Sequence, residues 1–125
     1  MTVRVFVYGS LRRGMENHDV MAGGRFTSVR RTEAHFQMLD LGRYPAVIDG
    51  DTAIVGEVYQ ISRQHLERLD VFEGVPELYV RRETVLDDGL LAWIYLYSGS
   101  ANGADALSNI PCVPDGDWVT WRLGG

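Results

Sequence analysis

Residues 3–14 read Val-Arg-Val-Phe-Val-Tyr-Gly-Ser-Leu-Arg-Arg-Gly and predict a strand that runs into a loop with glycine at both ends. Val3 to Tyr8 is dense in β-branched and aromatic residues and has apolar groups on both faces, so we expect an interior strand. Gly9 ends this strand, and Asn17 is placed to cap a short helix from His18 to about Ala22. A strand followed by a glycine loop and a helix start commonly directs backbone N–H groups at an anion.

Most of the remaining chain has the composition of short strands. Only Ser62 to Phe72 has helical periodicity, and we expect Trp118 and Trp121 to fold back onto the body as a C-terminal clasp. Between Arg25 and Leu41 we expect one strand, with or without an interruption. The further expected strands are Tyr44–Ile48, Ala53–Ile61, and Tyr79–Leu86 with Leu90–Tyr97, the last two forming a hairpin. The predicted fold class is therefore α+β, a small mixed β-barrel-like core with two short helices, because a sheet of this size must hide its edges.

A carboxylate falls on the apolar side of the predicted helix. Counted at 3.6 residues per turn, Glu73 lies on the same side as Leu66 and Leu69, and the glycine directly after it is a helix stop. Burial and the negative end of the helix dipole both oppose ionisation there, so Glu73 is a candidate general acid/base. The alternative is an ion pair with Arg81 or Arg82 in the next strand, and position alone favours that alternative at least as strongly.

Length and composition restrict the functional classes. With 125 residues we expect a single domain, residues 1–125, and the net charge of −5 without a basic segment argues against nucleic acid or an acidic membrane surface as partner. Cys112 is the only cysteine, which excludes an intrachain disulfide and a thiolate zinc site. The start lacks the apolar stretch of a signal peptide, and the longest apolar run, Leu90 to Tyr97, is too short for a membrane span. We therefore expect a cytoplasmic protein with a small-molecule or protein ligand.

Common catalytic motifs are incomplete in this chain. The loop Gly9–Gly14 has the spacing of a phosphate-binding loop, but Met15 and Glu16 replace its lysine and its serine or threonine. Ser10 lies outside a nucleophile elbow and has no base near it in the sequence. The three histidines are spread along the chain without a carboxylate cluster, so we treat them as surface or structural residues and predict no metal site.

One strand carries a row of aromatic residues. Trp93, Tyr95 and Tyr97 alternate onto one side of the expected strand Leu90–Tyr97. This side forms either a packing face in the core or the wall of a pocket, and the pattern does not separate the two.

Two separated motifs, in this order, resemble one known family. Residues 7–14, with Asn17-His18, and residues 69–74, Leu-Asp-Val-Phe-Glu-Gly, with Tyr79 and Arg81, closely resemble the gamma-glutamylcyclotransferase-like family. Within it, the sequence is most similar to the gamma-glutamylamine cyclotransferase branch and its small bacterial relatives. The likeness runs from the first strand to Tyr97, and Gly116-Asp117-Trp118 is similar to the closing G-D-W motif of the family.

The resemblance implies a barrel-like α+β fold with a cavity between the loop after the first strand and Glu73, which matches the acid/base of the family. The residues that match or resemble its substrate-binding positions are Tyr8, Gly9, Ser10, Leu11, Tyr44, Tyr79 and Tyr95. The implied reaction needs no cofactor: the α-amine of a gamma-glutamyl amide attacks its own γ-carbonyl and releases 5-oxoproline and a free amine, as in an acyltransferase or lyase. Because some members have no established substrate, the alternative is a non-catalytic small-molecule binding module of the same fold. The sequence does not identify the leaving amine, which we expect to depend on the cavity walls and on the loop Ser98–Pro114. It also leaves the oligomeric state open.

Overall fold

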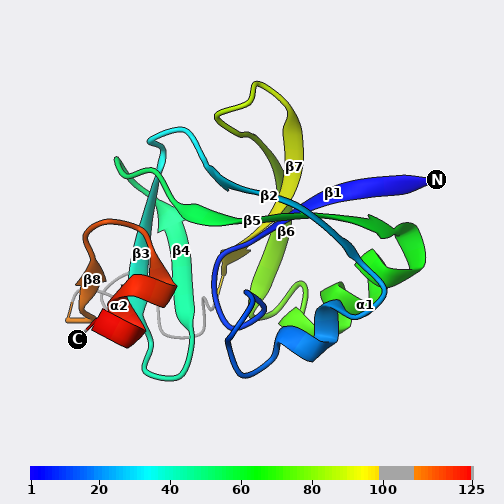
Figure 1. Ribbon diagram of the computed structural model, residues 1–125. Coiled ribbons are helices and arrows are strands. Elements are labelled where there is room, and N and C mark those ends of the chain that lie inside the picture. Colours follow the sequence, from blue (N-terminus) through cyan, green and yellow to red (C-terminus); the bar gives the residue numbers. More distant parts are fainter. Residues whose placement is uncertain (99–108, 125) are drawn as a thin grey trace.

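The computed structural model describes residues 1–98 and 109–124, and its strands form two sheets (Figure 1). Residues 99–108, part of the loop expected to help select the leaving amine, lie outside this range. The five-stranded sheet has the order β2-β5-β1-β7-β6, with bounds Thr2–Val7 (β1), Arg25–Arg31 (β2), Val55–Ser62 (β5), Tyr79–Val85 (β6) and Leu91–Tyr97 (β7). The other sheet has the order β4-β3-β8, with Phe36–Asp40 (β3), Pro45–Asp49 (β4) and Cys112–Val113 (β8). The helical segments in the described range are the 3-10 helix η1 (His18–Met21), α1 (Arg63–Glu73) and α2 (Trp118–Gly124).

The central strand β1 separates two apolar cores. It pairs antiparallel with β5 and parallel with β7. Neighbouring strand residues face opposite sides of a sheet. Phe6 and Tyr8 accordingly enter the core that β3, β4 and α2 share, whereas Val5 and Val7 enter the core that holds the buried side of α1. The apolar groups on both faces of β1 are thus explained, and the predicted interior strand is confirmed.

Residues 25–41 form two strands in different sheets, where the pattern predicted one. The edge strand β2 alternates between exposed and half-buried side chains and pairs only with β5 among the described strands. Thr32 then bridges to Leu86, and the chain enters β3, which pairs with β4 and buries Phe36 and Met38. The prediction failed because the two halves pack into different cores, which a continuous strand-forming composition does not reveal. The hairpin of β6 with β7 is confirmed.

The α+β class is confirmed, although the two sheets do not close into a barrel. Figure 1 shows α2 beside the three-stranded sheet and α1 on the other side of the molecule, near η1. The helix predicted at 62–72 is α1, whereas the one predicted at 18–22 is a single 3-10 turn. The C-terminal segment folds back as expected: Trp118 is fully buried, and Nε1 of Trp121 donates to Asp40 at 2.9 Å. No helix among the described residues is both long and apolar enough to cross a membrane.

Candidate functional site

A pocket of about 210 Å³ lies between the C-terminal end of β1, the start of β4 and the C-terminal end of α1. It is lined by Phe6, Val7, Tyr8, Gly9, Ser10, Leu11, Asn17, Tyr44, Pro45, Phe72, Glu73, Leu78, Tyr79 and Tyr95. Every site residue predicted from the sequence is in this set. The volume is below the ~300–1,000 Å³ of pockets for drug-sized ligands and suits a group the size of an amino acid.

Helix α1 carries Glu73 into the pocket at its last residue. The Ser62 hydroxyl begins the helix by accepting the N–H of His65 at 3.0 Å. Gly74 ends it in the left-handed region, with φ 69°, which a residue with a side chain rarely adopts. Leu69 on the same side is fully buried, and Glu73 is partly buried at the pocket wall. Both predicted helix ends are therefore confirmed to within one residue.

Glu73 has no ion-pair partner among the described residues. Arg81 instead makes two hydrogen bonds to Asp70, at 2.9 and 3.1 Å, and Arg82 bonds to Asp49 at 2.8 Å. The alternative that Glu73 serves as the ion-pair partner of one of these arginines is therefore wrong. Burial raises the pKa of Glu73 from 4.5 to about 7. A carboxyl group with this pKa can both accept and donate a proton near neutral pH.

The loop after β1 has bonded carbonyl groups and free N–H groups. The carbonyl groups of residues 9–11 are held by the N–H groups of Arg12 and Asn17, at 3.0 Å, and by Nδ1 of His18, at 2.9 Å. The N–H groups of residues 9–11 have no acceptor within the part of the chain that the structure describes. Successive free N–H groups can bind an anion, which is the role that the loop pattern predicts.

Asn17 supports this loop and is not the predicted helix cap. Its side chain makes no capping bond to η1, and its Nδ2 donates to Oγ of Ser10 at 3.1 Å. On the other side, a Cβ at Gly9 would lie 2.8 Å from the ring of Pro45, so only glycine lets the loop approach β4 this closely. Tyr44, 45% exposed, lies at the pocket rim, where the resemblance places it.

Three buried tyrosine hydroxyls in the pocket wall each donate to a protein acceptor. Tyr8 donates to the carbonyl of Tyr95 at 2.5 Å, Tyr79 to the carbonyl of Pro45 at 2.8 Å, and Tyr95 to Asp70 at 2.7 Å. Burial raises the pKa of all three hydroxyls, so they remain protonated. The hydroxyl oxygens of Tyr79 and Tyr95 can still accept a hydrogen bond, whereas that of Tyr8 has a backbone hydrogen bond from Val47. The wall is therefore rigid and offers a ligand acceptors.

The aromatic side of β7 fulfils both of the predicted alternatives. Tyr95 lines the pocket. Tyr97 packs edge-on against Tyr79, with ring centroids 5.5 Å apart, and the Arg81 guanidinium lies 4.3 Å from the centre of the Trp93 ring. One residue of the row thus faces the pocket, and its neighbours hold that wall in place.

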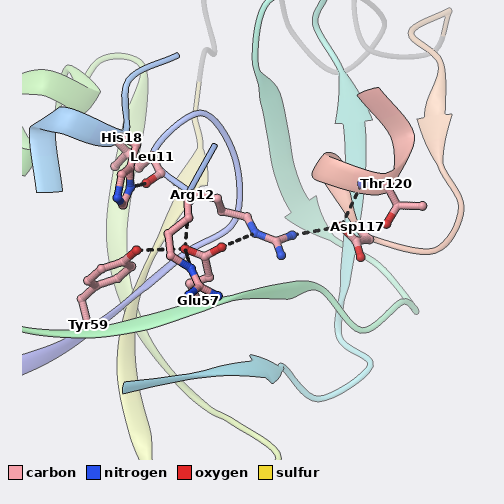
Figure 2. Close-up of polar contacts among 8 residues, drawn as sticks. Leu11, Arg12, His18, Glu57, Tyr59, Asp117 and Thr120 are labelled. Atoms are coloured by element: carbon pink, nitrogen blue, oxygen red, sulfur yellow. Dashed lines mark hydrogen bonds and ion pairs between the residues drawn. The ribbon is translucent and has the colours of Figure 1, made fainter. Parts of the chain in front are cut away.

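A cluster of charges next to the loop was not predicted (Figure 2). Glu57 of β5 accepts from Nε of Arg12 at 3.2 Å, from the N–H of Arg13 at 3.0 Å and from the hydroxyl of Tyr59 at 2.9 Å. Arg12 also donates from Nη1 to Asp117 at 2.9 Å. Glu57 is 3% exposed and Arg12 7%. The available signal was the one charged residue of a mostly apolar strand, with two adjacent arginines elsewhere in the chain to neutralise it.

The comparisons with known proteins identify one family. The family model described as gamma-glutamyl cyclotransferase, AIG2-like, matches residues 5–120. A Vibrio cholerae protein whose name gives gamma-glutamylcyclotransferase as a provisional activity is 39% identical over 114 residues, which cover 91% of this chain and 93% of that protein. The Escherichia coli gamma-glutamylcyclotransferase family protein YtfP is 30% identical over 117 residues, covering 94% and 96%. The crystal structure of a mouse AIG2-like protein has a TM-score of 0.78 at 26% identity, covering 89% of this chain and 85% of that one.

Proposed function

We propose, since the chain belongs to the AIG2-like gamma-glutamyl cyclotransferase family, that it cleaves a gamma-glutamyl amide by ring closure within the substrate. The α-amine nitrogen forms a bond to the γ-carbonyl carbon, and the bond from that carbon to the amide nitrogen breaks. The products are 5-oxoproline and a free amine, and no water or cofactor is consumed. The nucleophile belongs to the substrate, so the enzyme needs no activated serine or cysteine.

Glu73 is the group that moves the protons in this proposal. The attacking ammonium must lose two protons in forming the lactam N–H, and the leaving nitrogen must gain two to depart as an ammonium ion. One carboxyl group with a pKa of about 7 can carry them in turn, first as base and then as acid. The observation that carries the proposal is this carboxyl group in the pocket, without an ion-pair partner among the described residues, near a loop with free N–H groups.

The loop supplies the second requirement, a folded substrate conformation. The free N–H groups of residues 9–11 are suited to the substrate's α-carboxylate, which is thereby held without a cationic side chain. Fixing that end bends the α-amine toward the γ-carbonyl, and positioning of this kind accounts for much of the rate of intramolecular reactions. The tyrosine oxygens in the wall can accept from the ammonium group, and Tyr44 at the rim is placed to contact the leaving amine.

The test is a screen for 5-oxoproline release with the parent protein and Glu73→Gln. The panel contains gamma-glutamyl-ε-lysine, glutathione, gamma-glutamyl dipeptides and gamma-glutamyl polyamines. We expect Glu73→Gln to lower kcat by roughly 100- to 10,000-fold with a much smaller change in KM, because the amide preserves shape but cannot transfer the proton. Equal turnover by the two proteins would refute the mechanism.

A binding module without catalysis would give a different result in the same screen. No panel member would release 5-oxoproline, yet at least one would raise the melting temperature of the parent protein, since a ligand that binds only the folded state stabilises it.

A further inference from the structure

The side chain of Arg12 joins the loop to two distant parts of the chain. Arg12 follows the free N–H groups of residues 9–11 directly, and its guanidinium bonds Glu57, 45 residues later, and Asp117, 105 residues later. Figure 2 shows this guanidinium between the two carboxylates. None of these three side chains lines the pocket. Any effect they have on a bound substrate must therefore pass through the loop.

Stability alone does not account for this cluster. Withdrawing an ion from water costs several kcal/mol, and an apolar replacement of a buried ion pair is often equally stable or more stable. Arg12 and Glu57 are nevertheless both buried, and each bond is directional: Nε of Arg12 meets one oxygen of Glu57, and the other oxygen receives the N–H of Arg13. An apolar cluster would fill the space but would not fix the path of the backbone between residues 9 and 13.

Asp117 is itself held firmly in place. Its Oδ1 accepts the N–H of Thr120 at 3.2 Å, in addition to Nη1 of Arg12. On either side of it, the carbonyl of Gly116 accepts the N–H of Val55 at 2.8 Å, and Trp118 is fully buried. The C-terminal segment therefore presents a carboxylate at a fixed point, 2.9 Å from a residue of the loop.

We propose that Asp117 is a positioning residue, which acts through Arg12 to hold the N–H groups of residues 9–11 in the geometry that orients the substrate. This inference rests on the proposed function, because it treats the loop as the site of the substrate's α-carboxylate. It adds that the closing Gly-Asp-Trp segment, which does not line the pocket, sets the efficiency of the reaction.

The test compares Asp117→Asn with a matched control, Asp88→Asn. Asn at position 117 keeps an oxygen that can accept the N–H of Thr120 and removes the charge that faces Arg12. Asp88 likewise bonds an arginine, Arg4, at 2.8 Å and accepts a backbone N–H at 3.0 Å, but neither residue lines the pocket. The two aspartates also have similar side-chain exposure, 23% and 17%. Each variant thus loses a short, partly buried ion pair, and Asp88→Asn also loses a longer one to Arg30 at 3.7 Å, so the control removes at least as much charge pairing as Asp117→Asn.

We expect Asp117→Asn to lower kcat/KM by roughly 10- to 100-fold, mostly through kcat, because a displaced loop misorients the substrate. Asp88→Asn should leave both constants unchanged. Conversion of Arg12 to Gln should have an effect similar to that of Asp117→Asn, and the double variant should lose no more than Arg12→Gln alone, since Asp117 acts only through Arg12. Additive losses in the double variant would overturn the inference.

Amide hydrogen exchange gives a readout that does not depend on activity. The N–H groups of Arg12, Met15 and Asn17 close the loop through bonds of 3.0 Å, and they should exchange faster in Asp117→Asn but not in Asp88→Asn. If the parent protein released no 5-oxoproline while this difference was seen, the positioning role would stand and the proposed function would fail. Equal exchange at these three positions in the two variants, or an increase spread evenly over the whole protein, would overturn the inference.

Discussion

The protein holds two glutamates against the same loop in opposite ways. Glu57 receives hydrogen bonds from Arg12, Arg13 and Tyr59, and both of its oxygens are used. Glu73 lines the pocket and has no ion-pair partner among the described residues, and burial raises its pKa to about 7. Withdrawal from water alone therefore does not decide the role of a carboxylate. A carboxylate surrounded by donors fixes structure, whereas one left without them can exchange a proton.

The same contrast separates the two faces of the loop. On the side of Glu57 the backbone is tied to β5 and, through Arg12, to the C-terminal segment. On the side of the pocket it keeps N–H groups without acceptors in the described part of the chain. In our proposal, the bonds on the Glu57 side hold the loop in position for a ligand on the pocket side. Substitution of Glu57 and substitution of Glu73 should therefore have different effects.

The largest difference between a Glu57 variant and a Glu73 variant is expected in stability. Glu57→Gln should lower the free energy of unfolding by roughly 3–5 kcal/mol, because Arg12 loses a buried counter-charge and the new amide N–H₂ faces an N–H donor. Glu73→Gln, which has no ion pair to lose, should not lower it. Urea unfolding of the two variants beside the parent protein measures this. Equal destabilisation by both changes would show that the two glutamates do not differ in their structural role.

A smaller difference should appear in how the stability of the parent protein and of Glu73→Gln depends on pH. The folded-state pKa of Glu73, about 7, lies above its ordinary value of 4.5. Well below pH 4.5 the group is neutral in both states. Between pH 4.5 and 7 only the unfolded chain ionises, so the folded protein loses up to about 3 kcal/mol relative to it, and the loss is complete above about pH 7. Glu73→Gln removes this loss, so its melting temperature relative to the parent should rise between pH 5 and pH 8. A difference that does not change with pH would show that Glu73 ionises normally.

The smallest effect is expected at the pocket wall. Tyr79→Phe removes the bond to the carbonyl of Pro45 and should lower the free energy of unfolding by about 1 kcal/mol, with a several-fold loss in kcat/KM as the rim near Gly9 loosens. Tyr97→Phe is the control, since Tyr97 packs against Tyr79 and its hydroxyl has no acceptor among the described residues. Unchanged kcat and KM in Tyr79→Phe would reduce this residue to a packing role.

Local patterns in the sequence predicted the elements that carry the pocket. The apolar residues on both faces of β1, the Ser62 and Gly74 ends of α1 and the position of Glu73 each follow from a few neighbouring residues. Long-range pairings were missed for a physical reason. The two carboxylates that bind Arg12 lie 45 and 105 residues later in the chain, and no local spacing in the sequence indicates either bond.

The other errors have the same origin. Asn17 has a side chain suited to a helix cap, but tertiary contact with Ser10 uses it instead. The division of residues 25–41 between two sheets depends on which core each half enters, and Thr32 marks the change only once its bridge to Leu86 is known.

The burial of Trp118 has a consequence for synthesis of the protein on the ribosome. The core that contains Phe6 and Tyr8 is filled in part by Trp118, so β1 emerges from the exit tunnel more than a hundred residues before this neighbour is available. Until then, the side of β1 that carries Phe6 and Tyr8 lacks part of its packing, and exposed apolar surface of this kind favours aggregation. The core on this side of β1, which contains the pocket residues Phe6 and Tyr8, is therefore completed only after Trp118 has emerged.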